Sequence, residues 1–307
     1  MGYKEILFSK NGIAMYTLAR EFLKYNVGDK IPTVSELSEN FKLARGTVQN
    51  AVKLLQHSDA IRIESKGHVG SYLVKKNMGI LLEFAGISSI VGVMPLPYSK
   101  RYEGLASGLL VTMENHYNIP ASMAFMRGSK NRISMLLSNR YDFAIISKTA
   151  ADEMIEKHDN IIIVMSFGEY SYLSEHVIIF KNDKLTEIQD GMRIGVDSSS
   201  LDQKYLTEKV CAGKKVEYVS VDYSRILERV MRGDIDAAIW NKDEINDKYV
   251  KINYKEIKEF GTTANEAVMV VSKEESELVP LLRNIIDPAT VVNIQKLVLE
   301  GKITPSY

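Results

Sequence analysis

Short apolar runs alternate with longer helix-forming stretches over much of the chain, and this alternation restricts the possible folds more than any other feature. In the first half of this region the consecutive runs are IVGVMP, RYEGLASGLLVTMENH, PASMAFM, SKNRISMLLSN and YDFAIIS. In the second half they are MRIGVD, SLDQKYLTEKVC, KVEYVSV, YSRILERVMRG and DIDAAIW. Strands that alternate with helices in this way form βαβ units, whose strands are parallel. The sequence therefore predicts an α/β fold with two βαβαβ halves.

The segments around these halves indicate two lobes joined by crossing strands. Each half closes with a helix, then Arg140-Tyr-Asp142 or Arg232-Gly-Asp234, then an apolar strand. The stretch IIIVMSFGEYSYLSEHVIIF joins the halves, and the strand AVMVVS with the helices from Ser276 to Glu300 would return the chain across the hinge. This order of elements resembles the type 2 periplasmic-binding-protein fold. The resemblance implies a sensor domain with a ligand cleft between two lobes.

The N-terminal sequence and the most apolar stretch argue against a membrane protein. The run MGILLEFAGISSIVGVMPLP is interrupted by Glu83 and by glycines. A membrane span needs about 20 predominantly apolar residues, so we expect a linker followed by a buried strand. The first residues lack the apolar core of a signal peptide, and Ile6 stands where a myristoylation signal has Ser or Thr. The single cysteine, Cys211, excludes an internal disulfide and is typical of a reducing compartment. We therefore expect a cytoplasmic protein.

The net charge of zero hides a division along the chain. Residues 1–77 hold 12 lysines and arginines against 7 acidic residues, which leaves 27 against 32 for residues 78–307. A small basic segment joined to a larger acidic one indicates two roles, of which the basic one meets a polyanion.

The basic segment predicts three helices and a β-hairpin. GIAMYTLAREFLKYN forms an amphipathic helix, and VGDKIP predicts a turn after it. Thr33 and Glu36 fit a capping box at the start of a second helix, and LARGTVQNAVKLL forms the third. AIRIES and GSYLVKK predict strands joined by the tip KGHVG. This order is that of a winged helix-turn-helix, so we predict a DNA-binding domain over residues 1–77 and a two-lobed domain over residues 78–307.

The polar face of the third helix, residues 44–56, is predicted to enter the major groove of DNA. An arginine can make a two-point contact to guanine, and Gln or Asn can do so to adenine. Short hydroxyls, lysines and the wing tip suit phosphate oxygens. The predicted DNA contacts are Thr33, Ser35, Arg45, Thr47, Gln49, Asn50, Lys53, Lys66 and His68.

The stretch IPTVSELSENFKLARGTVQNAVKLLQHSDAIRIESKGHVGSYLV resembles the DNA-binding pattern of the GntR family of bacterial regulators. It departs from that pattern at three places. Ala44 replaces the usual serine cap, Gln49-Asn50 replaces the usual Arg-Glu, and the wing glycines Gly67 and Gly70 are more widely spaced. A winged helix combined with this type of sensor domain resembles the YhfZ group of regulators. LysR regulators share the sensor fold but have a different DNA-binding signature.

The effector site is predicted where strands end and helices begin, because the crevice of an open α/β sheet lies beyond the carboxyl ends of its strands. Helix N-termini at that edge favour anions. The Ser198–Ser200 run suits a carboxylate or phosphate, although a serine before a helix is also an ordinary cap. Arg127 could neutralise an acid. The predicted effector contacts are Pro97, Tyr98, Arg127, Ser129, Ser147, Ser198, Ser199, Ser200 and Asn241.

Catalytic and metal-binding signatures are absent from the sequence. It contains no GxGxxG, Walker A, GxSxG or HExxH motif. The five histidines are scattered without a metal-binding spacing, and Cys211 is expected in the core. We expect no catalytic residue, no cofactor and no metal.

The preferred interpretation is a ligand-responsive transcriptional regulator that binds double-stranded operator DNA as a homodimer and a small, anionic molecule between its lobes. Two alternatives stay open. One is an enzyme that uses the two-lobed fold and carries an autoregulatory DNA-binding segment, which turnover or a strongly shifted pKa in the cleft would favour. The other is an architectural dimer without a ligand, which a cleft filled by its own side chains would favour. The effector, the operator and the sign of regulation stay open.

Overall fold

The computed structural model describes residues 9–114, 120–248, 251–257 and 262–307. The chain divides into two compact units. Unit 1 comprises Met1–Ile90, Glu114–Ala121 and Glu275–Ile285, and unit 2 comprises Val91–Met113, Ser122–Glu274 and Ile286–Tyr307. Among the described residues, no helix is both long enough and apolar enough to cross a lipid bilayer.

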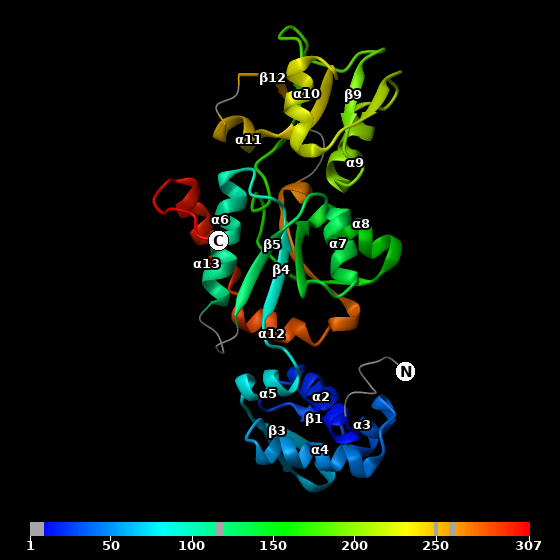
Figure 1. Ribbon diagram of the computed structural model, residues 1–307, viewed down its shortest axis with the longest axis vertical. Coiled ribbons are helices and arrows are strands. Elements are labelled where there is room, and N and C mark those ends of the chain that lie inside the picture. The colour runs from blue at the N-terminus through cyan, green and yellow to red at the C-terminus, as the bar shows by residue number, and fades with distance from the viewer. Residues whose placement is uncertain (1–8, 115–119, 249–250, 258–261) are drawn as a thin grey trace. The chain divides into compact units, whose positions relative to one another are not determined.

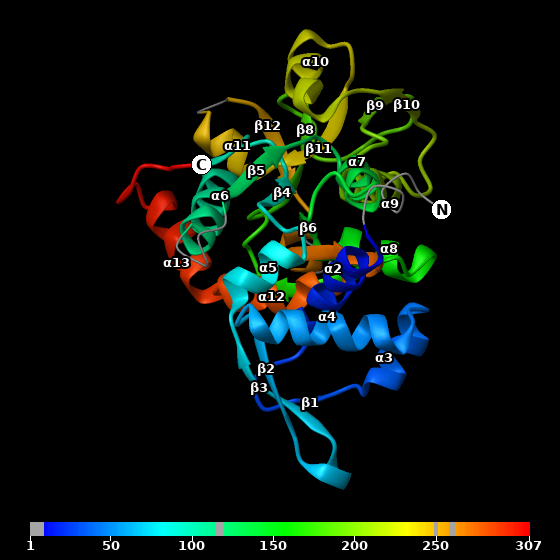
Figure 2. The ribbon, with the colours of Figure 1, turned by 60° about the horizontal axis from the view of Figure 1, so that its bottom comes forward.

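Unit 1 contains the predicted winged helix-turn-helix. Its helices are α2 (Lys10–Leu23), α3 (Val34–Phe41) and α4 (Arg45–His57), and its hairpin is formed by β2 (Ile61–Ser65) and β3 (Ser71–Lys76). The hairpin extends away from α4 (Figure 2). A two-residue strand, β1 (Lys30–Ile31), pairs antiparallel with β3 where the sequence predicted only a turn. Ile31 is buried, and its pairing with β3 makes this segment the third strand of the sheet.

Two further helices belong to unit 1. α5 (Met78–Phe84) lies where the sequence predicted a linker, and it packs against α2. The side chain of Asn77 caps it, and Leu81 and Leu82 are buried. α12 (Leu278–Ile285), from near the C-terminus, also packs against α2. Arg20 of α2 forms ion pairs with Glu275 and Glu277 just before α12.

Unit 2 is built on two five-stranded sheets, one in each lobe. The first sheet has the order β5 (Ala121–Phe125), β4 (Ile90–Met94), β6 (Phe143–Ser147), β13 (Ala267–Ser272) and β7 (Ile161–Ser166). The second has the order β10 (Glu217–Ser220), β9 (Arg193–Val196), β11 (Ala237–Asn241), β8 (His176–Phe180) and β12 (Asn253–Glu256). The pairs β4–β6, β9–β10 and β9–β11 are parallel, as predicted.

The crossing segments make both sheets mixed. The chain passes to the second sheet after β7 and returns with β13, which pairs antiparallel with β6 and β7. β8 pairs antiparallel with β11 and with β12, a strand that the sequence analysis missed. The predicted return of AVMVVS to the first lobe is therefore confirmed.

Helices cover both sheets (Figure 1). α7 (Ser129–Leu137) and α8 (Lys148–His158) pack on one face of the first sheet, and α6 (Lys100–Met113) packs along α13 (Pro288–Leu299). In the second lobe, α10 (Ile226–Arg232) and α11 (Lys242–Asp247) pack on one face and α9 (Leu201–Val210) on the other. Cys211 is buried against α9.

Candidate functional site

The exposed face of α4 is mostly polar, as the sequence predicted, with Leu54 (45% exposed) as its apolar member. Val48, Ala51 and Leu55 are fully buried against the other helices of unit 1. The side chains on the opposite face are exposed, and they are Arg45, Gln49, Asn50 and Lys53. The cap residue Ala44 makes no side-chain hydrogen bond to the start of α4. The first backbone N–H groups of α4 therefore keep their capacity to donate to a phosphate oxygen.

The remaining predicted DNA contacts lie on α3 and on the hairpin. Thr33 is the cap of α3: its hydroxyl accepts from the Glu36 N–H at 3.2 Å, and Glu36 Oε2 accepts from the Thr33 N–H at 2.6 Å. Ser35 and Thr47 are half-buried, and His68 is exposed at the hairpin tip. Lys66 is also exposed, with its ammonium group 4.8 Å from the centre of the Tyr72 ring.

A cavity of about 50 Å³ lies between the two lobes of unit 2. Four of the predicted effector residues line it: Tyr98, Arg127, Ser129 and Ser200. A buried water requires at least about 10–15 Å³ of such volume, so the cavity has room for an ion of about four or five non-hydrogen atoms.

The other predicted effector residues do not line this cavity; they are Pro97, Ser147, Ser198, Ser199 and Asn241. Three of them make local hydrogen bonds instead. The Ser147 hydroxyl caps α8, Ser199 donates to Asp197, and the Asn241 side chain caps α11. Serine and asparagine at the end of a strand were thus ordinary helix caps at several positions.

Arg132 is the buried cation of the cavity. Only 2% of the surface of Arg132 is exposed. Its guanidinium donates to the carbonyls of Ile145 (3.1 Å) and Met126 (2.8 Å) and to the Tyr172 hydroxyl (2.9 Å). Among the described residues, no carboxylate oxygen lies within 4.0 Å of it. A buried guanidinium without a direct ion-pair partner is costly, so this site favours an anion.

Arg127, which the sequence predicted as the neutralising residue, is placed differently. It pairs with Asp222 at 3.0 Å, and its side chain is 40% exposed. Its charge is therefore already balanced at the surface.

Two titratable groups share the cavity with Arg132. Asp202 is 5% exposed, and the Ser147 hydroxyl lies 2.7 and 2.6 Å from its two carboxylate oxygens. Burial raises the pKa of Asp202 to about 6, against the opposing effects of Ser147 and Arg132. Burial lowers the pKa of His176 to about 4, so its imidazole is neutral at pH 7.

Direct contacts connect the lobes beside the cavity. The Leu201 N–H of the second lobe donates to Ser129 Oγ at 3.3 Å, and the Lys130 N–H donates to the Ser199 carbonyl at 3.3 Å. Gly128 has a positive φ of 75°, and a Cβ there would lie 2.7 Å from the Ser199 Cβ. Glycine thus allows the start of α7 to approach the second lobe closely.

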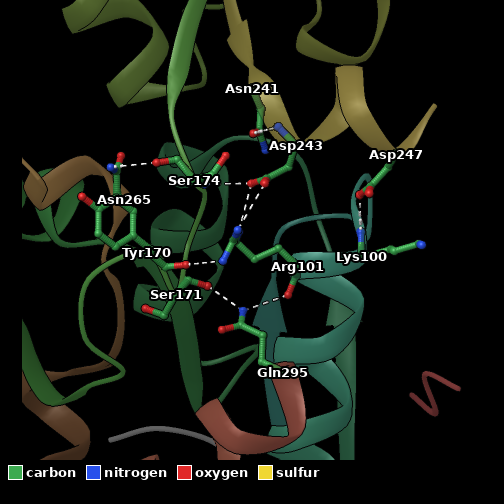
Figure 3. Close-up of polar contacts among 10 residues, drawn as sticks. All are labelled: Lys100, Arg101, Tyr170, Ser171, Ser174, Asn241, Asp243, Asp247, Asn265 and Gln295. Atoms are coloured by element: carbon green, nitrogen blue, oxygen red, sulfur yellow. Dashed lines mark hydrogen bonds and ion pairs between the residues drawn. The ribbon is translucent and has the colours of Figure 1, made fainter. Parts of the chain in front are cut away.

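A polar network at the hinge also connects the lobes (Figure 3). The start of α6 meets α11, where Asp247 Oδ2 accepts from the Lys100 N–H at 2.8 Å. Gln295 of α13 donates to the carbonyls of Arg101 (2.9 Å) and Ser171 (2.7 Å). Asn265 donates to the Ser174 carbonyl at 3.0 Å. The network thus connects α6, α11, α13 and the segment between β7 and β8.

Five polar residues that line the cavity were not predicted from the sequence, namely Tyr102, Arg132, His176, Asp202 and Tyr223. Only Arg132 could have been identified from the local sequence pattern. Arg132 stands between Ser129 and Leu136 at the helical spacing of the apolar stripe of α7, where a charge is unusual. The others came from distant segments without a local signal. Among the described residues, no group of three His, Cys, Asp or Glu side chains could hold a metal ion.

Comparisons with known proteins agree with this architecture. Residues 26–73 match a helix-turn-helix domain model, and residues 78–307 match the YhfZ C-terminal domain model. The YhfZ protein of Escherichia coli (strain K12) is 33% identical over 307 residues, which cover 99% of this chain and 100% of that protein. The crystal structure of YhfZ from Shigella flexneri is also 33% identical, with a TM-score of 0.61 over 75% of this chain and 97% of that one.

More distant structures share the two-lobed fold. The alkanesulfonate-binding protein SsuA from Xanthomonas axonopodis pv. citri, bound to MOPS, is 11% identical with a TM-score of 0.55, over 70% of this chain and 75% of that one. An ancestral arginine-binding protein bound to arginine is 14% identical, with a TM-score of 0.51. The match covers 71% of this chain and 99% of that one. At this identity the likeness concerns the fold alone. From its domain match and its full-length similarity, the chain belongs to the YhfZ family.

Proposed function

We propose that this protein is a cytoplasmic transcriptional regulator that binds operator DNA through α4 and the β2–β3 hairpin and a small anion between the lobes of unit 2. The exposed row Arg45, Gln49, Asn50 and Lys53 supports the DNA-binding role, because these side chains can reach base edges or phosphates from the major groove. We assign this role to residues 1–77, as a GntR-type winged helix, and the effector role to residues 78–307.

The observation that carries the anion site is the Arg132 guanidinium. It is 2% exposed, lines the cavity between the lobes and has no ion-pair partner among the described residues. An anion in the cavity would accept hydrogen bonds from the guanidinium and from the Ser129 and Ser200 hydroxyls. The anion would balance the buried charge, and this balance would stabilise the closed arrangement of the lobes.

Regulation follows if the DNA-binding state differs in its affinity for the anion. We propose a homodimer, in which two α4 helices meet half-sites about 34 Å apart. A change in lobe closure would alter the spacing of these helices and with it the affinity for the operator.

Thermal unfolding of the full chain with a panel of carboxylates, phosphates and sulfonates tests the anion site. At a concentration one hundred times Kd, one bound anion stabilises the protein by about 2.7 kcal/mol. Arg132→Gln should abolish this stabilisation. Arg127→Gln is the matched control and should keep it, because Arg127 is paired with Asp222. Stabilisation that survives in Arg132→Gln and disappears in Arg127→Gln contradicts the assignment. Arg132→Lys, which keeps the charge, separates loss of binding from loss of the fold.

Binding of the full chain to fragments selected from random DNA, with and without the stabilising anion, tests the regulatory role. A change in affinity is expected with the anion present. Equal affinity for DNA with and without the anion would show that anion binding and DNA binding are independent, and would refute control by the anion.

The pKa values of Asp202 and His176 favour a second candidate, an enzyme acting on the bound anion, because strongly shifted pKa values in a cleft are typical of active sites. Incubation of the protein with each stabilising anion distinguishes an enzyme from a regulator, because only an enzyme consumes the anion.

The small volume of the cavity favours a third candidate, a regulator without an effector. The complete absence of a stabilising anion would support that candidate.

A further inference from the structure

The carboxyl group of Asp202 lies at the cavity of the proposed anion site and forms no ion pair with any described residue. Asp202 is the second residue of α9 and is 5% exposed. Its two oxygens share the Ser147 hydroxyl from the end of β6, at 2.7 and 2.6 Å. Among the described residues, no Lys, Arg or His nitrogen lies within 4.0 Å of them. An ionised Asp202 would repel an anion held by Arg132, because both groups line one cavity of about 50 Å³.

We propose that the anion site takes up one proton together with its anion, and that Asp202 is the group that receives this proton. The inference rests on the proposed anion site. In the bound state the protonated carboxyl can donate a hydrogen bond to the anion, whereas the carboxylate can only repel it. The Ser147 hydroxyl can serve both states of Asp202, because it donates a hydrogen bond to the carboxylate and can accept one from the protonated carboxyl.

Among the described residues, two charged side chains act on the pKa of Asp202. Arg132 of α7 favours the carboxylate, and Glu153 of α8 opposes it. Burial is the largest effect and raises the pKa of Asp202 to about 6. Within the described residues, β9 and β11, which also pack against α9, add no charge that acts on Asp202.

The other titratable side chains at the cavity keep one charge state near neutral pH. Burial lowers the pKa of His176 to about 4, which leaves it neutral between pH 5 and 8. Burial raises the pKa of the Tyr102 and Tyr172 hydroxyls above their ordinary value, so both stay protonated. Asp202 is therefore the group of this cavity that changes its charge near neutral pH.

The sign of the pH dependence follows from linkage. A bound anion raises the pKa of Asp202 further, because two negative charges repel each other. Between the pKa of the free protein, about 6, and that of the complex, Kd rises about tenfold per pH unit. Between pH 5 and pH 6, where His176 is still neutral, the affinity is highest and changes little.

Calorimetric titration of the full chain with methanesulfonate tests this inference. Methanesulfonate has five non-hydrogen atoms and stays ionised from pH 5 to 8, so any proton uptake belongs to the protein. Titrations at pH 7 in two buffers of different ionisation enthalpy should show an uptake approaching one proton per anion. Asp202→Asn keeps an oxygen that accepts from Ser147, and it should bind without proton uptake and equally well at pH 6 and pH 8. Asp152→Asn, the same change in the surface Lys148–Asp152 pair, is the matched control and should keep the uptake.

The outcomes separate the inference from the function on which it rests. Binding of methanesulfonate without proton uptake, or uptake that persists in Asp202→Asn, overturns the role of Asp202 and leaves the anion site intact. If neither methanesulfonate nor sulfate binds between pH 5 and 8, the anion site itself is refuted, and the proton linkage with it.

Discussion

Arg101 and Asp243 form a two-point ion pair that joins the two lobes of unit 2. Arg101 Nε lies 3.0 Å from Asp243 Oδ2, and Arg101 Nη2 lies 3.3 Å from Asp243 Oδ1. The remaining Arg101 nitrogen donates to the Tyr170 carbonyl at 2.7 Å, and Asp243 Oδ2 also accepts from the Ser174 N–H at 2.8 Å (Figure 3). Both side chains are at most 15% exposed. The pair thus links the two lobes directly at the hinge.

Asp243→Asn is expected to lower the free energy of unfolding by about 2–3 kcal/mol, because it leaves the Arg101 guanidinium without its counter-charge. Urea unfolding followed by the fluorescence of Trp240, the single tryptophan, measures the change. Asp152→Asn breaks the exposed Lys148–Asp152 pair and is the control, with an expected change within about 0.5 kcal/mol. Equal losses in the two variants would show that the hinge pair contributes no more than a surface pair.

Gly108→Ala is expected to destabilise unit 2 by about 1–3 kcal/mol. A Cβ at this position of α6 would lie 2.7 Å from the Val291 carbonyl oxygen of α13, so the two helices would have to separate. Gly46→Ala in α4 is the opposite case, because a Cβ there meets no atom within 4 Å. It should stabilise the protein by about 0.5–1 kcal/mol through helix propensity. Urea unfolding compares both variants, and equal effects would contradict the close packing of α6 and α13.

Glu244 should make the stability of the protein depend on pH. Burial raises its pKa to about 7 from the model-peptide value of 4.5. The folded state therefore binds more protons than the unfolded state between these two values, and stability falls as the pH rises through this range. Glu244→Gln should remove up to about 3 kcal/mol of the difference in unfolding free energy between pH 4.5 and pH 8. Glu228→Gln, at an exposed glutamate, is the control. An unchanged pH dependence in Glu244→Gln would refute the assignment.

Arg45→Ala is expected to weaken binding to the selected operator by about 1–3 kcal/mol and to leave the unfolding free energy unchanged, because the side chain is exposed. Binding to unrelated DNA should change little. Lys296→Ala removes one exposed positive charge from α13 and is the control, with operator affinity as in the parent protein. Unchanged operator affinity in Arg45→Ala would exclude α4 as the recognition helix.

Lys66→Ala tests the hairpin separately from α4. If Lys66 neutralises one phosphate, its loss lowers the slope of log K against log salt concentration by about 0.9. Filter binding at several salt concentrations measures this slope. A slope equal to that of the parent protein would mean that the hairpin tip does not contact the DNA backbone.

Local patterns predicted much of the fold because they depend on neighbours in the sequence. The capping box of Thr33 and Glu36 and the hairpin with its tip at Gly67 are both confirmed. The apolar alternation predicted the parallel pairs β4–β6, β9–β10 and β9–β11. β12 escaped prediction because its residues, NYKE, are largely exposed and its pairing with β8 defines it as a strand.

Asp142 and Asp236, rather than the two aspartates of the Arg-x-Asp stretches, occupy equivalent positions in the two lobes. Asp142 Oδ2 accepts from the Val91 N–H at 2.7 Å, and Asp236 Oδ2 accepts from the Arg193 N–H at 2.9 Å. Each aspartate directly precedes a central strand and bonds to a neighbouring strand. Asp236 is therefore the structural counterpart of Asp142, a match that strand pairing decides and that spacing alone could not.

Local sequence patterns set which faces of the helices and strands are apolar, and with them the winged helix and the two-lobed α/β architecture. Which polar groups meet depends on how the elements pack in three dimensions. Ser147 and Asp202 are 55 residues apart, and Arg101 and Asp243 are 142 residues apart. Burial follows from local periodicity, whereas a hydrogen bond between side chains requires both partners at one place. That place is created by the packing of the two lobes, which also turned Arg132, rather than Arg127, into the unbalanced charge of the cavity.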